Sequence, residues 1–241
     1  MTVTRAEICV TACADAWRGD GEILAAAMGT CSVLGARLAR STFEPDLLTT
    51  DGGPLLTAEP IPFGAKAGDV EGWMPFRDHL WLVLNGRRHV MMGASQIDKF
   101  GNTNISCVGD WAQPKSQLLG VRGAPGNTRC NPTSYWIPKH STRVFTEKVD
   151  MVSGIGWDRG AHEIRRVITD LCVLDFETED RRMRLRSVHP GVSVETVVEQ
   201  TGFELVVPDE VPESRTPSEE ELKVLREVLD PRGLRDREVR S

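Results

Sequence analysis

The first fifty residues alternate between helix and strand signals, and this alternation restricts the possible folds more than any other feature. A capping pattern at Thr4 predicts a helix that extends to about Trp17, because the threonine hydroxyl can accept a hydrogen bond from an end N–H group. A short strand over 22–27, a helix over 28–40 and a strand over 47–50 follow. Strands joined by crossover helices pair in parallel, so the sequence predicts an α/β fold.

The later part of the chain adds an antiparallel hairpin and two helices. Residues 165–176 alternate as one strand, and 182–188 form its partner across a turn at 177–180. Ser193 caps a short helix, and the sequence TPSE at 216–219 predicts a second capping box that opens the last helix. The apolar face of that helix holds Leu222, Leu225, Val228 and Leu229.

Two long stretches rich in Pro, Gly and polar residues separate these segments. They cover 57–78 and 112–142, and we expect the first to end in a short helix near 73–80. A buried-type strand over 89–93 lies between the two stretches. Loops of this length usually bind a ligand or a partner. We expect them to contact a partner chain or, alternatively, to fold over the chain's own core. Their aromatic residues, a type enriched at interfaces, are Trp73, Trp111, Tyr135 and Trp136.

These elements predict one α/β domain over 1–207, with a mainly parallel, twisted sheet flanked by helices and a late antiparallel hairpin. A C-terminal helix and a mixed-charge tail follow over 208–241. No apolar stretch reaches the ~18 residues that span a bilayer, and the N-terminus lacks the pattern of a signal peptide. We therefore expect a cytoplasmic protein.

Charge and cysteine usage exclude several classes of partner. The formal net charge of −6 argues against nucleic acid or an anionic membrane, because both need a dense basic surface. A small anionic ligand is still compatible, since a local site needs only a few cations and backbone N–H groups. The six cysteines lie mostly in apolar runs without CxxC spacing, and the histidines are scattered, so we expect buried thiols and no metal site.

The signatures of several enzyme classes are missing from the sequence. It holds no G-x-S-x-G nucleophile elbow, no P-loop and no G-x-G-x-x-G turn. His162-Glu163 begins like the HExxH zinc motif, but Arg166 stands where the second histidine must be. Candidate functional residues must therefore come from less common patterns.

The stretch GASQIDKFGNTNIS, residues 93–106, leaves a buried strand through small residues. Gln96, Asn102 and Asn104 place neutral donors and acceptors around the end of that strand, where ligands sit in open α/β sheets. A tight turn at Gly101 is the alternative, because glycine adopts positive φ without strain.

The stretch GVRGAPGNTRCNPTSYW, residues 120–136, combines glycines with arginines. Gly123 and Gly126 allow backbone N–H groups to converge on one point, and such a nest holds a phosphate or a developing oxyanion. Arg122 and Arg129 add positive charge beside it. An ordinary loop fits the same spacing.

A third candidate lies in LLTTDGGPLL, residues 47–56, where Asp51 follows a short apolar strand at the mouth of a glycine turn. Strand-then-glycine turns often carry the working residues of α/β enzymes. Asp51 is either a nucleophile, a base, or a residue that stands where a catalytic group is absent.

These stretches carry a resemblance to a known family, the β-type subunits of class I CoA-transferases, over roughly residues 4–240. The family-level likeness rests on PDLLTTDGG (45–53), GASQIDKFGN (93–102), VITDLCVLDF (167–176) and HPGVSVETVVEQTGFEL (189–205). A closer likeness points to the branch of hydrolases that cleave rings in actinobacterial cholesterol breakdown. It rests on GWMPF (72–76), NGRRHVMMGASQIDKFGN (85–102), VRGAPGNT (121–128), TSYW (133–136) and VDMVSGIGWD (149–158).

The resemblance gives Asp51 a specific meaning. In transferases of this family the β-type subunit supplies a glutamate in a Glu-small-Gly turn, and its carboxylate attacks the acyl-CoA thioester. Asp51 is one methylene shorter, which withdraws the carboxylate by about an ångström, whereas attack needs contact near ~3 Å. The sequence thus departs from the transferase pattern at its key position.

What the resemblance implies instead is hydrolytic, retro-Claisen cleavage of a carbon–carbon bond in a cyclic β-keto acyl-CoA derived from a steroid. The catalytic glutamate would belong to an α-type partner in an (αβ)2 heterotetramer, and CoA would enter only as part of the substrate. Two alternatives stay open: a true acyl-CoA:carboxylate CoA-transferase using Asp51, and a non-catalytic scaffold. The residues expected to line the substrate or CoA pocket are Asp51, Gly52, Gly53, Gln96, Asn102, Gly123, Ala124, Gly126 and Asn127.

Overall fold

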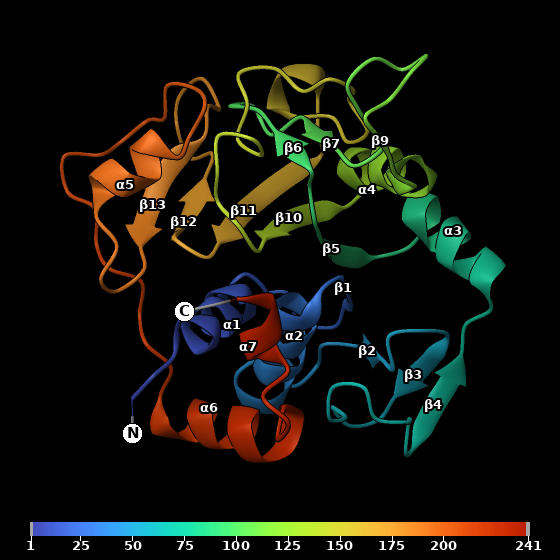
Figure 1. The fold of residues 1–241 in the computed structure, drawn as a ribbon. Helices are drawn as coiled ribbons and strands as arrows, with labels where there is room; N and C mark the ends of the chain where they lie inside the picture. The colour runs from blue at the N-terminus through green and yellow to red at the C-terminus, as the bar shows by residue number, and fades with distance from the viewer. Residues whose placement is uncertain (1, 240–241) are drawn as a thin grey trace. The chain divides into compact units, whose positions relative to one another are not determined.

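The computed structural model describes residues 2–239, which fall into two compact units. The first unit joins the chain up to Met91 with the segment from Arg215 onward, and the second unit is Met92–Ser214. The predicted α/β class is confirmed, with parallel strand pairs, flanking helices and a late antiparallel hairpin (Figure 1). The predicted boundary near residue 207 stays a prediction.

Two helices that pack closely form the centre of the first unit. They are α1 (Arg5–Asp15) and α2 (Thr30–Thr42), and they lie against each other in Figure 1. The contact requires a glycine, because a Cβ built on Gly35 would lie 2.6 Å from the Cβ of Cys13. The capping box at Thr4 is confirmed, since its hydroxyl accepts from the Glu7 N–H and the Glu7 side chain accepts from the Thr4 N–H.

The strands of the first unit form two small groups. Strand β1 (Leu24–Ala27) pairs in parallel with β5 (Arg88–Met92), from Leu24 opposite Arg88 to Ala27 opposite Met91, as the helix–strand alternation predicts. A separate antiparallel sheet contains β2 (Thr49–Thr50), β3 (Leu55–Thr57) and β4 (Val70–Trp73). The stretch 57–78 is therefore less irregular than expected, and its predicted helix begins a turn later, as α3 (Phe76–Asn85).

The C-terminal segment completes the first unit. It comprises α6 (Glu219–Lys223), the π-helix η3 (Val224–Leu229) and α7 (Arg235–Glu238). The predicted cap at 216–219 is wrong: the capping box joins Ser218 to Glu221, whose carboxylate also pairs with Arg215. Leu225 and Leu229 are buried, but Val228 is exposed, because the wider π-helical turn rotates it off the apolar face.

A buried carboxylate ties this segment to α1. Glu7 is fully buried, and its Oε1 accepts from Arg226 Nε at 2.7 Å and from Arg235 Nη2 at 2.9 Å. The α2 N-terminus has no side-chain cap of its own at Gly29. Instead, Glu238 of α7 accepts from the N–H groups of Thr30 at 3.2 Å and Cys31 at 2.7 Å.

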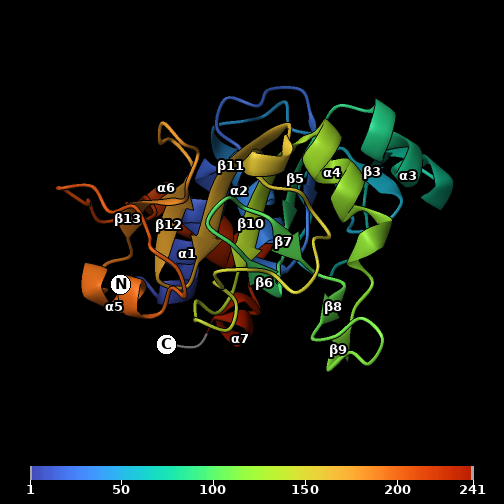
Figure 2. The same ribbon diagram turned by 90° about the horizontal axis from the view of Figure 1, so that it is seen from above.

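Four strands in the order β10–β11–β12–β13 form the sheet of the second unit (Figure 2). Their bounds are β10 (Pro132–Ile137), β11 (Glu163–Thr169), β12 (Cys172–Asp175) and β13 (Arg184–Val188). The first pair is parallel and the others are antiparallel. The prediction of one strand over 165–176 is wrong. The Thr169 hydroxyl accepts from the N–H groups of Leu171 and Cys172, both at 3.1 Å, and this turn divides the segment.

The stretch 112–142 also contains regular structure that the sequence analysis took for a loop. It includes the whole of β10 and the helix α4 (Ala124–Cys130), while Tyr135 and Trp136 are buried inside the unit and are not available to a partner. Trp111 is exposed, as expected. The remaining elements are β6 (Gln96–Ile97), β7 (Thr103–Asn104), β8 (Cys107–Val108), β9 (Ser116–Gln117), η1 (Gly120–Arg122), η2 (Trp157–Arg159) and α5 (Val194–Glu199).

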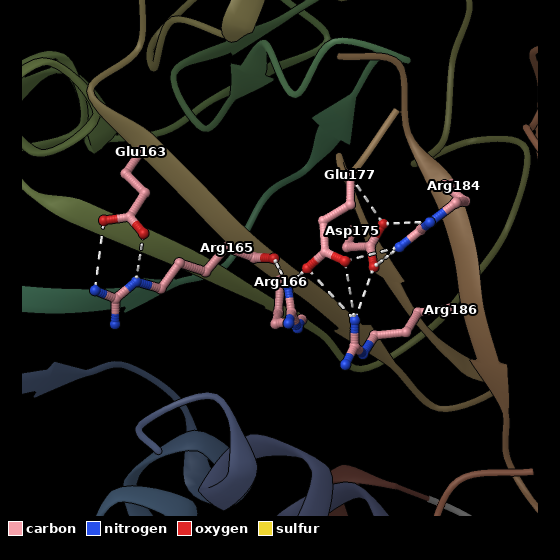
Figure 3. A network of polar contacts seen from close by, with 7 residues as sticks. All are labelled: Glu163, Arg165, Arg166, Asp175, Glu177, Arg184 and Arg186. Carbon is pink, nitrogen blue, oxygen red and sulfur yellow. Dashed lines mark hydrogen bonds and ion pairs between the residues drawn. The ribbon is translucent and has the colours of Figure 1, made fainter. Parts of the chain in front are cut away.

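An ion network covers one face of this sheet (Figure 3). Asp175 is fully buried and accepts from Arg184 at 2.9 and 2.8 Å and from Arg186 at 3.1 Å. Burial alone would raise the pKa of Asp175, but the hydrogen bonds from the two arginines and from the Glu177 N–H outweigh it and lower that pKa. The network therefore holds β12 to β13 through a carboxylate whose ionised form the arginines favour.

Most of the thiols are buried, as the sequence predicts. Five of the six cysteines are buried and all six are free, while Cys130 is exposed. Among residues 2–239, no helix is long and apolar enough to cross a membrane, and no group of three or more potential metal ligands forms.

A neutral histidine sits in the core of the second unit. His140 stacks on Phe145 with ring centroids 3.9 Å apart, and its ring nitrogens lie 3.2 Å from the Thr169 hydroxyl and 3.0 Å from the Thr201 hydroxyl. Burial lowers the pKa of His140 from 6.5 to about 3. The folded protein therefore keeps this ring uncharged at pH values where the unfolded chain protonates it.

This difference predicts a loss of stability in mild acid. Between pH 6.5 and 3 the unfolded state binds a proton that the folded state does not, so the free energy of unfolding falls as the pH falls. At pH 4.5 the loss from His140 is about 2 kcal/mol. Urea unfolding at pH 7 and pH 4.5 measures it: His140→Gln should lose less stability than the parent chain, whereas the exposed-site control His162→Gln should behave like the parent. If His140→Gln lost as much stability between pH 7 and pH 4.5 as the parent chain does, His140 would not be the source of the acid sensitivity.

Candidate functional site

A cavity of about 190 Å³ opens beside β1 in the first unit. Small residues create the space, since three alanines of β1 and Ala36 of α2 line it. The β2–β3 turn contributes Gly52 and Gly53 to its lining. Met74, in the segment that leads into α3, and His79 of α3 itself complete it.

The wall of this cavity carries positive charge. Arg37 of α2 is 3% exposed and Arg88 of β5 is 6% exposed, and both line the cavity together with the half-buried His79. Burial lowers the pKa of Arg88 to about 10, and burial also lowers the pKa of Arg37 although the charge of Asp51 acts in the opposite direction. No described residue that lines the cavity carries a carboxylate.

The Asp51 carboxylate is engaged by its own turn. Its Oδ1 accepts from the Gly53 N–H at 2.9 Å and from the Leu55 N–H at 3.1 Å, and Gly52 takes the positive φ of 93° that this turn requires. Asp51 itself does not line the cavity. The aspartate thus supports the turn that brings the two glycines to the cavity, and one of its two carboxylate oxygens is held by the backbone.

The other predicted pocket residues lie in the second unit. Gln96 accepts from Asn104 Nδ2 at 2.7 Å and donates to Asp150 at 3.0 Å, so its amide joins two loops. Asn102 donates to Asp98 at 2.9 Å and to Asp158 at 2.8 Å, and accepts from the Gly156 N–H at 2.8 Å.

These two amides share a structural role. Each is buried, and the contacts above use donors as well as acceptors of both side chains. Burial raises the pKa of the neighbouring Asp98, and hydrogen bonds from Asn102 and Phe100 work against that rise. Gln96 and Asn102 therefore fix the loops that follow β5, and their contact with a substrate stays a prediction.

The glycine-rich stretch after residue 120 does not form a nest. Gly123 has φ −131°, and Ala124 and Gly126 lie inside α4, where the N–H groups point along the helix instead of converging. Asn127, also buried in α4, donates to the Met92 sulfur at 3.3 Å. The nest interpretation is wrong because Pro125 favours a helical start and the Thr128 hydroxyl bonds the Ala124 carbonyl one turn back.

Sequence reasoning missed the two arginines of the cavity. Arg37 lies inside a helix and Arg88 opens an apolar strand, so neither belongs to a polar or glycine-rich stretch. One signal was available: Arg37 falls between Leu34 and Leu38, on the buried face of α2. A charged residue at such a position marks a paired or ligand-facing group.

The turn geometry predicts how substitutions of Asp51 affect folding. Asp51→Ala leaves two N–H groups without their acceptor and should lower the free energy of unfolding by about 1–2 kcal/mol, whereas Asp51→Asn keeps the acceptor oxygen and should cost much less. Urea unfolding of both variants measures the difference, with the exposed Asp46→Ala as control. Equal losses in the alanine and asparagine variants would contradict the proposed role of Oδ1.

Known proteins share both the sequence and the fold. The family model for coenzyme A transferase matches residues 81–200. The chain is 52% identical to the cholesterol ring-cleaving hydrolase IpdB subunit of Rhodococcus jostii (strain RHA1), covering 98% of this chain and 96% of that protein. It is 46% identical to the IpdB subunit of Mycobacterium tuberculosis (strain ATCC 25618 / H37Rv), covering 99% of each.

A solved structure agrees with these sequence matches. The crystal structure of Rhodococcus jostii RHA1 IpdAB contains a chain with a TM-score of 0.95 and 51% sequence identity, and the match covers 100% of both chains. Likeness of this extent in sequence and in fold confirms the resemblance inferred from the motifs. The chain belongs to the coenzyme A transferase family.

Proposed function

We propose that this chain is the β-type subunit of a heteromeric hydrolase that opens a steroid-derived ring by cleaving a carbon–carbon bond of a cyclic β-keto acyl-CoA. The observation that carries the proposal is the 52% identity, over 98% of the chain, to a subunit named for cholesterol ring cleavage. The engaged carboxylate at Asp51 supports it, because this residue is not arranged as a nucleophile.

The reaction needs a base and an electrophilic ketone. The base takes a proton from water, and the hydroxide adds to the ring ketone carbon. The tetrahedral alkoxide collapses to a carboxylic acid, and the ring C–C bond breaks with its electron pair passing to the neighbouring acyl enolate. The enolate takes up the proton held by the base and the acid ionises, so the reaction consumes one water and needs no redox partner.

The base comes from a partner chain in this proposal. The cavity of the first unit has arginines and a histidine in its described wall but no carboxylate. An α-type subunit carrying a glutamate supplies the missing group, and the two chains assemble as an (αβ)2 heterotetramer. CoA enters as part of the substrate, and we propose no resident cofactor. A cytoplasmic location stays a prediction from the sequence.

A transferase is the second candidate, and Asp51 decides against it. A thioester-forming carboxylate must leave its own backbone and reach the acyl carbon, but Asp51 Oδ1 holds two N–H groups at 2.9 and 3.1 Å. The shorter side chain adds to this disadvantage. A scaffold without any part in the site is the third candidate, and it predicts that no substitution in the cavity alters turnover.

Turnover by the co-expressed heteromer tests these candidates. With a cyclic β-keto acyl-CoA, the hydrolase forms a ring-opened acyl-CoA that carries one oxygen from heavy-oxygen water, detected by mass spectrometry. Asp51→Asn should keep at least a third of the parent rate, because the turn keeps its acceptor. CoA transfer to an added carboxylate without ring opening, lost in Asp51→Asn, would instead establish the transferase.

An exposed apolar surface on α3 fits the expected partner. The α3 stripe consists of Phe76, Leu80, Trp81 and Leu84, which share one side of the helix, with Trp73 next to them at the end of β4. These five side chains are between 44% and 70% exposed, while Val83 of the same helix is buried. Their apolar surface is on the order of 600 Å², close to the ~800 Å² that each partner contributes to a standard interface.

Charge placed on the α3 stripe should prevent assembly. Trp81→Glu combined with Leu84→Glu should weaken binding of a tagged α-type subunit at least tenfold, because two carboxylates would be desolvated at the contact. Both positions are exposed, so the isolated chain should keep its unfolding midpoint. Val228→Glu, at an apolar position 49% exposed outside the α3 stripe, is the matched control. Normal co-purification of the double variant would exclude this surface.

A further inference from the structure

The cavity beside β1 contains a buried arginine that forms no ion pair with any described residue. Arg37 is 3% exposed, and its Nη1 and Nη2 donate to the backbone carbonyls of Ile61 at 2.9 Å and Thr50 at 3.3 Å. Among residues 2–239 it forms no ion pair within 4.0 Å. Carbonyl dipoles satisfy some of its donors, and the charge of Asp51 acts on it without forming an ion pair.

Burial of such a charge is costly unless an anion arrives. A guanidinium taken out of water loses its hydration. A negatively charged partner with matching geometry offsets the free energy that this loss costs. Asp51 lies nearby, but its Oδ1 is held by the N–H groups of Gly53 and Leu55. The remaining described wall is apolar, glycine or cationic, with the hydroxyls of Thr49 and Thr50 as its other polar groups.

We propose that this cavity is a carboxylate-binding pocket in which Arg37 holds the anionic end of the acyl group. Arginine pairs with carboxylates through parallel N–H donors, which gives direction as well as attraction. Arg88, a second cation of the wall, adds positive potential, while Ala25, Ala26 and Ala36 leave room for the adjoining carbons.

The size of the cavity fits one end of a ligand. Pockets that enclose a whole drug-sized ligand have volumes of about 300–1,000 Å³, whereas this cavity has about 190 Å³. It therefore suits a carboxylate with a few carbons and not an entire acyl-CoA. A carboxylate in this cavity would face the two arginines, which belong to the interior wall and are less than a tenth exposed.

This assignment rests on the proposed function for its biological meaning. Hydrolytic ring opening converts a ketone into a carboxylate, so the product gains a negative charge that the substrate lacks. Arg37 binds that new carboxylate and keeps the opened chain from folding back onto the enolate. A residue with this role favours the ring-opened product over the closed ring.

The chain offers a matched control for Arg37. Arg40 lies one turn further along α2, and its guanidinium likewise donates to backbone carbonyls, of Leu47 at 2.8 Å and of Ala58. It does not line the cavity. Substitution of Arg40 therefore removes similar structural hydrogen bonds while leaving the pocket intact.

Titration of the heteromer with glutarate, and with glutaramide as the uncharged analogue, tests the proposal by calorimetry. Glutarate should bind the parent and Arg40→Gln, at least tenfold more tightly than glutaramide. Arg37→Gln should lose at least tenfold in glutarate affinity, and Arg37→Lys should recover part of it. Equal affinity in Arg37→Gln and the parent, or equal binding of glutarate and glutaramide by the parent, would overturn the proposal.

A crystal of the parent heteromer soaked with glutarate keeps the test decisive if the Arg37 variants fail to assemble. A carboxylate within hydrogen-bond distance of the Arg37 guanidinium is the expected result, and glutarate bound elsewhere, or nowhere, overturns the pocket. These experiments can also refute the proposed function and the proposed pocket independently of each other. Glutarate binding that depends on Arg37 in a heteromer without ring-opening activity would refute the function alone, and ring opening without glutarate binding would refute the pocket alone.

Discussion

The buried carboxylate of Glu7 is the interaction on which the first unit depends. Burial by itself would raise the pKa of Glu7, but hydrogen bonds from Arg226 and the Thr4 N–H, with the charges of Arg235 and Arg226, outweigh burial and lower that pKa. An ionised group at that depth is tolerated only while these partners surround it, so α1 and the C-terminal segment must pack together. Through the close contact at Gly35, α1 then fixes α2, and α2 carries Arg37 into the cavity wall.

The chemistry of a carboxylate at this turn depends on whether backbone N–H groups hold it. At Asp51 a side chain of two carbons closes a turn and supports Gly52 and Gly53, whereas the longer glutamate expected in transferases extends past such a turn. One methylene thus separates a group that holds the pocket from a group that attacks the thioester. The fold is retained while the reactive carboxylate is assigned to another chain, which illustrates how function lies in the site and not in the architecture.

Regular patterns made most of the fold predictable. Caps at Thr4 and Ser193, the alternation of helix and strand before residue 50 and the hairpin of β12 and β13 all follow from local rules. Where prediction failed, a side chain competed with the pattern. The Thr169 hydroxyl divides one apparent strand into two, and α4 forms although Gly123 and Gly126 suggest a loop.

The site was predictable only where its residues stand in turns. Gly52 and Gly53 were identified because glycine after a strand is a visible signal, whereas Arg37 is hidden in a helix whose apolar neighbours dominate the pattern. Which buried arginine faces a hollow depends on tertiary packing, and no local spacing encodes that. The prediction of an anion nest near Gly123 was wrong for the opposite reason. Its glycine spacing suggested a site, but the residues form an ordinary helix.

The cap that Glu238 places on α2 has a consequence for synthesis. The helix that carries Arg37 receives its N-terminal hydrogen bonds from a residue that lies 208 and 207 positions further along the chain than the two N–H groups it caps. Pairing across that sequence separation is slow, because a long chain must close before the contact is gained. The first unit therefore completes its contacts only after Glu238 has been synthesised, whereas the second unit, Met92–Ser214, can fold ahead of it on the ribosome.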